Sequence, residues 1–398
     1  MNVFLFGAGS SKAYNDSKSG LKLPLSREFF KIYNELDISS NGWIINGDVV
    51  NYVRDHRNFE PINFGQFDED IEVLHSEIQI KYLDAIKEQN NEGIIKYGKA
   101  FTQLVFLFCS VINEIQNGTE SIFHKRLVES LNDDDIIITF NWDTLIDRAL
   151  KNNKNWSVQN GYFVEPKLIY ADEWKTGIKG DSNILLLKLH GSTNWLSSYI
   201  NYDFQLGQIS FLHDGPQNTF YAYEYSTKPY SCYDGRYLGG YDEFSMGYYP
   251  PNLPPTEKEK KIKDGRVLIS AILRTGINPK GKSTGEGVIS MPIIIPPVKS
   301  KSYEFYGDLF IKLWEKAEAV LTKANKIYIL GYSFPVTDVL STNLFKHAFL
   351  KRTTMPEVII INPSPKEIHS KFKYEFGIPE NKLKIISENI TSDYEICL

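Results

Sequence analysis

Runs of consecutive aliphatic residues recur along the chain and stop at glycine, asparagine or proline. They are too short for helices, and they lack the alternation of a strand that is exposed on one face. Strands buried on both faces have this pattern, and they belong to parallel sheets covered by helices on each side. The runs that we predict to be strands are residues 3–6, 136–140, 184–189, 292–295, 327–330, 358–361 and 383–386.

Segments with helical spacing lie between these runs. In residues 70–88, for example, Ile71, Leu74 and Ile78 recur every three or four positions, as on the buried face of an amphipathic helix. The alternation of strands and helices predicts an α/β fold, a doubly wound Rossmann-like parallel sheet. We predict helices from residue 26 onward and over residues 70–88, 94–115, 120–131 and 308–323.

Two insertions interrupt this pattern within what we predict to be a single domain, residues 1–398. Residues 20–131 form a helical insertion between the first two strands. Residues 198–290 form an irregular insertion with eleven tyrosines between Tyr199 and Tyr249. Tyrosine is enriched at binding surfaces, but it also packs ordinary loops, and the sequence leaves both interpretations open.

Charge and cysteine content restrict the possible partners. The net charge of −5 argues against nucleic acid, which needs a concentrated basic surface, and a solvated loop explains the basic run at 258–263. The cysteines Cys109, Cys232 and Cys397 form no C-x-x-C pair, so we expect no zinc and a reducing compartment. The first residues lack the basic segment of a signal peptide, and no stretch approaches the ~20 apolar residues of a membrane span. We therefore expect a cytoplasmic protein without membrane association.

The first predicted strand ends in Gly7-Ala8-Gly9-Ser10-Ser11. Glycines let a backbone approach a pyrophosphate, and the amide groups at a helix start favour its negative charge. The motif lacks the third glycine of G-x-G-x-x-G, and a plain strand-to-helix turn explains it equally well. Taken alone, it predicts nucleotide binding only weakly.

Two more polar motifs follow predicted strands, where ligands of open α/β sheets bind. Asn141 and Asp143 lie two residues apart after the second strand, so both side chains point the same way in extended geometry. Helix capping by either residue is the simpler alternative. His190 follows the strand at 184–189 and precedes a glycine, and an imidazole there is suited to accept a proton near neutral pH.

Gly331 and Ser333 follow the strand at 327–330, and Asn362 follows the strand at 358–361. Ordinary β–α turns explain each of these residues individually. Five polar motifs at the carboxyl ends of five strands are harder to explain in that way. Because these ends meet at one edge of a parallel sheet, we expect the motifs to share a cleft.

The order of these motifs resembles the sirtuin NAD-binding fold over essentially the whole chain: Gly-Ala-Gly-Ser, Phe-Asn-x-Asp, Leu-His-Gly-Ser, Gly-x-Ser and a strand ending in Asn. Residues 139–143, 293–297 and 331–334 look most like the sirtuin-like proteins of bacterial antiphage defence, which hydrolyse NAD. Two departures separate the chain from the sirtuin deacylases. Only Cys232 stands where those enzymes usually carry two zinc-binding cysteine pairs, and Phe140 replaces their glutamine.

The resemblance implies an NAD glycohydrolase (NADase) whose substrate is NAD. Asn141 would orient a ribose hydroxyl or the attacking water, and His190 would accept the proton. Asp143 would hold the nicotinamide carboxamide, and Asn362 the adenosine ribose. The residues along the pyrophosphate would be Gly7, Ala8, Gly9, Ser10 and Ser333, and Gly331 would be a further NAD-binding residue.

Two other classes of function remain as alternatives: an NAD-dependent protein deacylase, and a module that senses NAD or ADP-ribose without turnover. The presence of both Asn141 and His190 favours turnover. The resemblance further implies NAD depletion in antiphage defence. Unregulated depletion would kill the host, and no sensor domain is evident. We therefore expect control by assembly into a homo-oligomer or by a HerA-type ATPase partner.

Overall fold

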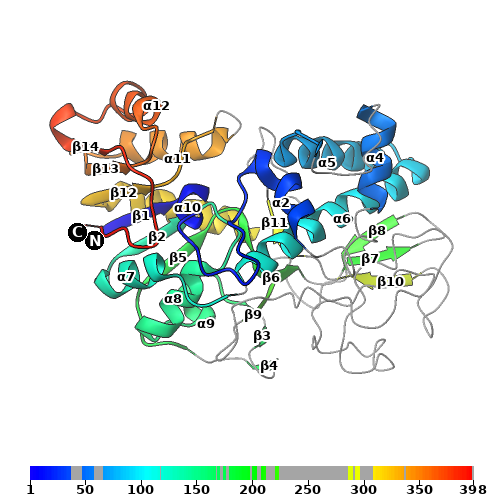
Figure 1. Cartoon of the computed structure of the whole chain (residues 1–398), viewed down its shortest axis with the longest axis horizontal. Helices are drawn as coiled ribbons and strands as arrows, with labels where there is room; N and C mark the ends of the chain where they lie inside the picture. The colour runs from blue at the N-terminus through cyan, green and yellow to red at the C-terminus, as the bar shows by residue number, and fades with distance from the viewer. Residues whose placement is uncertain are drawn as a thin grey trace.

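A six-stranded, all-parallel sheet forms the centre of the computed structural model (Figure 1). Its strands are β1 (Asn2–Phe6), β2 (Ile136–Thr139), β5 (Leu185–Lys188), β12 (Lys326–Leu330), β13 (Glu357–Ile361) and β14 (Leu383–Ile386). The structure describes residues 1–36, 47–57, 66–116, 118–166, 168–170, 174–175, 179–197, 200–203, 208–211, 220–223, 286–289, 292–295, 308–335 and 338–396. The parallel sheet confirms the predicted α/β class.

The strand order is β14-β13-β12-β1-β2-β5. Counted along the chain, the six strands run 3-2-1-4-5-6 from one edge to the other, which is the order of dinucleotide-binding α/β folds. The chain therefore reverses its direction across the sheet between β1 and β12. Ligands of such sheets bind beyond the carboxyl ends of the strands at this reversal point.

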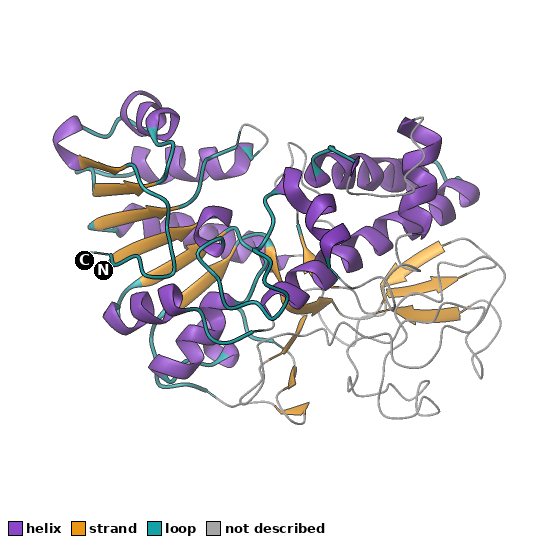
Figure 2. Cartoon of the chain, viewed as in Figure 1, coloured by secondary structure: helices purple, strands orange, loops and turns teal. Residues whose placement is uncertain are grey.

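Helices cover both faces of the sheet (Figure 2). Right-handed crossovers running in opposite directions place their helices on opposite faces. The helices α7 (Ile122–Ser130), α8 (Leu145–Lys154) and α9 (Val158–Gly161) belong to the β1-to-β5 half. The other half carries α10 (Asp308–Lys323), α11 (Val339–Leu350), α12 (Lys366–Ser370), η7 (Lys371–Glu375) and η8 (Glu380–Lys382). Burial on both faces explains the uninterrupted aliphatic runs. The edge strand β14 is the exception, with Lys384 and Ile385 exposed.

The helical insertion has a hydrophobic core of its own, separate from the core around the sheet. Its helices are α2 (Phe29–Glu35), α4 (Gly47–Arg57), α5 (Ile71–Lys87) and α6 (Asn91–Gln116), after the short α1 (Ala8–Ser11) and η1 (Ser26–Glu28). Asp70 caps α5 by accepting a hydrogen bond from the Glu72 amide at 2.9 Å. The helix α7 falls inside the predicted 20–131 insertion, but its apolar side packs into the sheet core.

The prediction for residues 292–295 was wrong about the sheet that they join. The strand β11 (Pro292–Ile294) pairs antiparallel with β6 (Gly191–Ser197) in a second sheet of order β11-β6-β9-β3-β4. Its apolar run reflects burial of Ile293 and Ile294, which an antiparallel strand also permits. The other strands are β9 (Phe220–Tyr223), β3 (Leu168–Tyr170), β4 (Trp174–Lys175) and, in a third sheet, β10 (Glu286–Ile289), β7 (Ile200–Asp203) and β8 (Gln208–Phe211).

Most of the predicted tyrosine-rich insertion (198–290), including the basic run at 258–263, lies outside the described residues. In the described part of the chain, no helix is both long and apolar enough to cross a membrane.

Candidate active site

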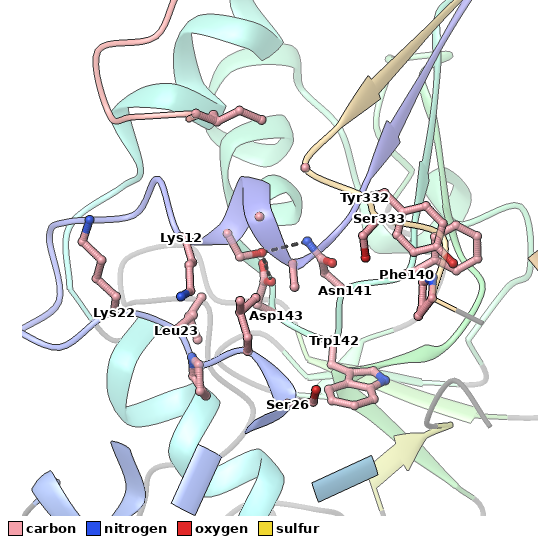
Figure 3. Close-up of a pocket in the computed structure, with 18 of the residues that line it drawn as sticks. Lys12, Lys22, Leu23, Ser26, Phe140, Asn141, Trp142, Asp143, Tyr332 and Ser333 are labelled. Atoms are coloured by element: carbon pink, nitrogen blue, oxygen red, sulfur yellow. Dashed lines mark hydrogen bonds between the residues drawn. The ribbon is translucent and has the colours of Figure 1, made fainter. Parts of the chain in front are cut away.

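A cavity of about 850 Å³ lies beyond the carboxyl ends of the central strands, at the reversal point between β1 and β12 (Figure 3). One side is formed by residues that directly follow β1, β2, β5, β12 and β13, and we call it the strand wall. The opposite side, the apolar wall, consists of Leu23, Phe29, Ile71, Phe108 and Ile112. The strand wall contains Ala8, Gly9, Asn141, Asp143, His190, Gly331, Ser333 and Asn362. Of the predicted site residues, Gly7 and Ser10 alone do not line the cavity.

Backbone hydrogen bonds extend the sheet past the ends of its strands and hold the strand wall in place. The Gly7 amide donates to Leu330 O and the Gly331 amide to Ile361 O, each at 3.0 Å. Beside them the Phe140 amide donates to Phe6 O at 3.2 Å. The backbone hydrogen bonds that pair the strands therefore continue into the residues that line the cavity and fix their positions.

The glycines of the first motif allow two strand ends to touch. The Gly9 amide donates to Gly331 O at 3.0 Å, and a Cβ atom on Gly9 would lie only 2.8 Å from that oxygen. Gly331 has φ of +64°, and a Cβ there would lie 2.5 Å from the Ser10 nitrogen. A side chain at either position would push the two segments apart. The Gly9 amide is thus already hydrogen-bonded to Gly331 O within the protein. The helix α1, which contains Gly9, is only four residues long.

Asn141 is oriented by acceptors from the β1–α1 turn. Its Nδ2 atom donates to Gly7 O at 2.9 Å and to Ser11 Oγ at 2.7 Å. Since a carbonyl oxygen only accepts, the contact with Gly7 identifies which end of the amide is the nitrogen. The Ser11 hydroxyl in turn donates a hydrogen bond to Asp143 Oδ2 at 2.6 Å. Among the described residues none donates to Asn141 Oδ1, so this oxygen is available to a ligand hydroxyl or a water.

Asp143 is almost completely buried, with 7% exposure, and both carboxylate oxygens accept hydrogen bonds. Oδ2 takes the Ser11 hydroxyl and Oδ1 takes the Leu145 amide at 3.1 Å, at the start of α8. The capping role considered for Asp143 is therefore present in the structure. Asn141 donates to Ser11, and Ser11 donates to Asp143, so this series of hydrogen bonds ends at the Asp143 carboxylate.

A cluster of buried polar side chains on the side away from the cavity holds the backbone of Asp143. Lys188 Nζ donates to Asp143 O at 2.6 Å and pairs with Asp147 Oδ2 at 3.0 Å, and both side chains are fully buried. Tyr162 donates to the other oxygen of Asp147 and accepts from Asn194 Nδ2 at 2.9 Å. Burial raises the pKa of Asp147, while the Lys188 ammonium opposes that rise. These residues join β5, β6 and α8 directly beneath the cavity.

His190 lines the cavity, although 1% of its surface is exposed. The Phe140 and Trp314 rings lie 4.9 and 6.3 Å from its ring, between centroids. The glycine after it has a specific role. Gly191 adopts φ of +79°, and a Cβ there would lie 2.0 Å from Ile293 O, where β11 passes. The Ile295 amide donates to His190 O at 2.9 Å, so β11 fixes the histidine backbone.

Asp338 is a buried carboxylate close to His190 that the sequence analysis missed. Its Oδ2 atom lies 3.5 Å from His190 Nε2 and accepts the Tyr332 hydroxyl at 2.7 Å. Asp338 follows β12 by eight residues and accepts from the Ser341 amide at 3.4 Å, as the N-cap of α11. The available signal was an acidic residue shortly after Gly331, at the start of a helix, where a helix cap is a sufficient explanation.

Ser333 and Asn362 lie on the β12 and β13 side of the cavity. Ser333 is exposed, and Asn362 is 8% exposed with its Oδ1 atom accepting from the Ser364 amide at 2.9 Å. Two lysines, Lys12 and Lys22, also line the cavity. Lys12 pairs with Glu28 at 2.7 Å.

In the described part of the chain, His, Cys, Asp and Glu residues form no group of three that could hold a metal ion. Cys232 and Cys397 lie outside those residues, and the expectation of no zinc stays a prediction. No family model matches the sequence, and no curated protein matches it.

Proposed function

We propose that the protein is an NAD hydrolase that cleaves the bond between nicotinamide and ribose. The observation that carries the proposal is the meeting of Asn141 and His190 in one cavity at the reversal point of a 3-2-1-4-5-6 sheet. Dinucleotides bind across this crevice in such sheets. The cavity volume of about 850 Å³ also falls within the roughly 300–1,000 Å³ of small-ligand pockets.

The two ends of the cavity suit the two ends of NAD. Asn141 and His190 belong to the β2 and β5 side, opposite the apolar wall. A flat nicotinamide ring that packs against the apolar wall would be removed from contact with water. Asn362 belongs to the β13 side, where its amide would meet the adenosine ribose. Between them, Ala8 and Ser333 would meet the pyrophosphate. This orientation places the bond to be cleaved beside Asn141 Oδ1.

Cleavage then needs positioning more than acid catalysis. The C1′–N1 bond breaks with its electron pair on the nicotinamide nitrogen, so nicotinamide leaves as a neutral molecule. The ribose passes through an oxocarbenium-like state, and the oxygen of a water oriented by Asn141 bonds to C1′. His190 accepts one proton of that water and returns it to solvent. The products are nicotinamide, ADP-ribose and one proton.

Removing either group tests the proposal. His190→Ala should lower nicotinamide release from NAD by about 10²–10⁴-fold, the usual contribution of a proton acceptor. Asn141→Ala should lower it by about 10²-fold or more, because the attacking water loses its orientation. Asn152→Ala and His347→Ala, at exposed positions, are the matched controls and should keep wild-type turnover. Wild-type protein that releases no nicotinamide at any protein concentration and with the ATPase added, or active Asn141→Ala and His190→Ala proteins, would falsify the assignment.

The same assay separates the alternatives. Nicotinamide released from NAD alone supports the hydrolase. Release that requires an acyl-lysine peptide indicates a deacylase, and NAD binding without release indicates a sensing module. A second product measurement, ADP-ribose against acyl-ADP-ribose, distinguishes the first two outcomes directly.

We further propose that turnover serves NAD depletion in antiphage defence and is controlled by assembly, as a homo-oligomer or with a HerA-type ATPase. The supporting argument is chemical, because a soluble NAD hydrolase without control would exhaust the NAD of its host. Nicotinamide release per chain should then rise with protein concentration or on addition of the ATPase. Mass photometry over the same dilution series measures the assembly. Constant activity per chain from a monomer at all concentrations excludes control by self-assembly.

A further inference from the structure

The segment that follows β12 brings a second carboxylate to the reaction centre from a distant part of the chain. Asp338 Oδ2 lies 3.5 Å from His190 Nε2, and the two side chains are 0% and 1% exposed. His190 follows β5 at the edge of the sheet, whereas Asp338 precedes α11, which connects β12 to β13. Their contact therefore crosses the reversal point where the cavity lies.

The surroundings stabilise Asp338 as an anion. The Tyr332 hydroxyl donates to its Oδ2 atom at 2.7 Å, and the Ser341 amide donates to its Oδ1 atom. Burial and the Asp338 charge raise the pKa of Tyr332 well above its usual value, so this tyrosine keeps its proton and remains a donor. The positive end of the twelve-residue helix α11 adds to the stabilisation.

A carboxylate facing Nε2 decides which nitrogen of a neutral histidine carries the proton. A proton on Nε2 would face the carboxylate as its acceptor, and Nδ1 would then be the basic nitrogen. The negative charge also stabilises the imidazolium that forms when Nδ1 takes a proton. The separation of 3.5 Å is longer than a formed hydrogen bond of about 2.9 Å, and such contacts tighten when substrate is bound.

We infer that Asp338 is a positioning residue for His190: it fixes the Nε2-protonated tautomer and stabilises the imidazolium during turnover. The inference rests on the proposed function for its catalytic consequence. The tautomer itself is a property of the free protein. Capping of α11 is the simpler role for Asp338, and the test must separate the two.

Three substitutions achieve that separation. Asp338→Asn preserves size and removes the charge. Asp338→Ser preserves the N-cap, since serine is also a preferred cap, and likewise removes the charge. Asp338→Glu preserves the charge and is a poorer cap. If Asp338 positions His190, kcat for nicotinamide release falls by about 10²–10⁴-fold in the Asn and Ser variants. The Glu variant recovers turnover relative to both.

Two further readouts identify the cause. ADP-ribose affinity, measured by calorimetry, should stay within threefold of wild type in the Asn and Ser variants, because the binding surface is intact. The ring ¹⁵N shifts of His190, assigned by comparison with His190→Ala, should report the Nε2-protonated form in the wild type and its loss in Asp338→Asn. Should Asp338→Asn fail to fold, Asp338→Ser provides the same comparison.

The inference is overturned if both charge-removing variants turn over NAD within threefold of the wild type, or if the tautomer of His190 is the same with and without the Asp338 charge. A capping role alone predicts an active Asp338→Ser and a weakened Asp338→Glu. Failure of the proposed function has a different signature. The wild type would then release no nicotinamide, while the ¹⁵N comparison would still decide whether Asp338 sets the tautomer.

Discussion

The two walls of the cavity differ in the chemistry of their side chains. The strand wall presents an amide, an imidazole and hydroxyls, each carried by a residue that follows a strand of one rigid sheet. The apolar wall is formed by the helical insertion and the segment leading into it, and it presents leucine, isoleucine and phenylalanine. In the proposed hydrolase, the groups that orient the substrate would thus lie on the sheet, and the insertion would supply an apolar surface.

The difference extends to the groups behind each wall. Behind the strand wall, Lys188 and Asp147 are fully buried and are paired with each other and with neighbouring groups. Behind the apolar wall, His75 packs 5.7 Å from Phe108, between ring centroids, and is 0% exposed. Neither nitrogen of His75 has a hydrogen-bond partner among the described residues. The strand wall therefore depends on compensated charge, and the apolar wall on packing around the uncompensated imidazole of His75.

Breaking the buried ion pair should have the largest effect. Lys188→Met leaves Asp147 buried without its cation and should lower the free energy of unfolding by about 3–5 kcal/mol. Denaturant titration measures this change. The control is the double variant Lys188→Met with Asp147→Leu, which removes both charges and should recover most of the stability. A cost below about 1 kcal/mol for the single variant would show that the pair is not needed.

His75 should make stability depend on pH. Burial lowers its pKa from 6.5 to about 3, so at pH 5 the unfolded chain binds a proton that the folded chain does not. The free energy of unfolding is therefore highest with respect to His75 above pH 6.5, where the imidazole is neutral in both states. It falls as the pH falls from 6.5 towards 3. Between pH 7 and pH 5 this loss is about 2 kcal/mol.

His75→Leu should remove that part of the pH dependence, measured as the difference between unfolding free energies at pH 7 and pH 5. The exposed His347→Leu is the matched control, because its side chain is 62% exposed and should leave the difference unchanged. An identical pH dependence in His75→Leu and wild type would mean that His75 is solvated or paired in the folded protein.

The apolar wall itself should affect substrate binding rather than the chemical step. Leu23 is 5% exposed and lines the cavity. In the proposed complex with NAD, its truncation to alanine would remove apolar contact with the nicotinamide ring. We expect KM for NAD to rise by about tenfold with kcat unchanged, as for an interaction equally strong in the ground and transition states. Leu350→Ala, at an 83% exposed position, is the control. A fall in kcat instead would place Leu23 among the groups that position the reacting atoms.

The sequence predicted the strand wall far better than the apolar wall. Asn141, His190, Ser333 and Asn362 were identified because each follows an aliphatic run, and parallel strands end at one edge. The insertion was recognised as helical, but the packing that turns Phe108 towards the cavity depends on tertiary contacts without a local pattern.

The sequence analysis assigned β11 to the wrong sheet and missed Asp338, and both errors have the same physical origin. Burial produces the aliphatic run of β11 in an antiparallel sheet as readily as in a parallel one, so the sequence could not assign its partner strand. Asp338 satisfies a helix cap locally, and its proximity to His190 arises from a fold that brings together residues 148 positions apart. Local sequence patterns predict the contacts that a residue makes with its neighbours in sequence. They do not predict a further contact with a residue that the fold brings close from a distant part of the chain.

The contact between Gly9 and Gly331 also determines when the cavity can exist during synthesis of the chain. The β1 strand pairs with β12, whose first residue is number 326, so the strand wall stays incomplete until the ribosome has passed that residue. At about 5–20 residues per second, ribosomes need tens of seconds to cover that distance. From the addition of His190 until that of Lys326, the growing chain carries Asn141 and His190 without the β12 side of the strand wall. If the protein is the proposed NAD hydrolase, products that end before residue 326 should therefore release no nicotinamide from NAD, without any separate inhibitor.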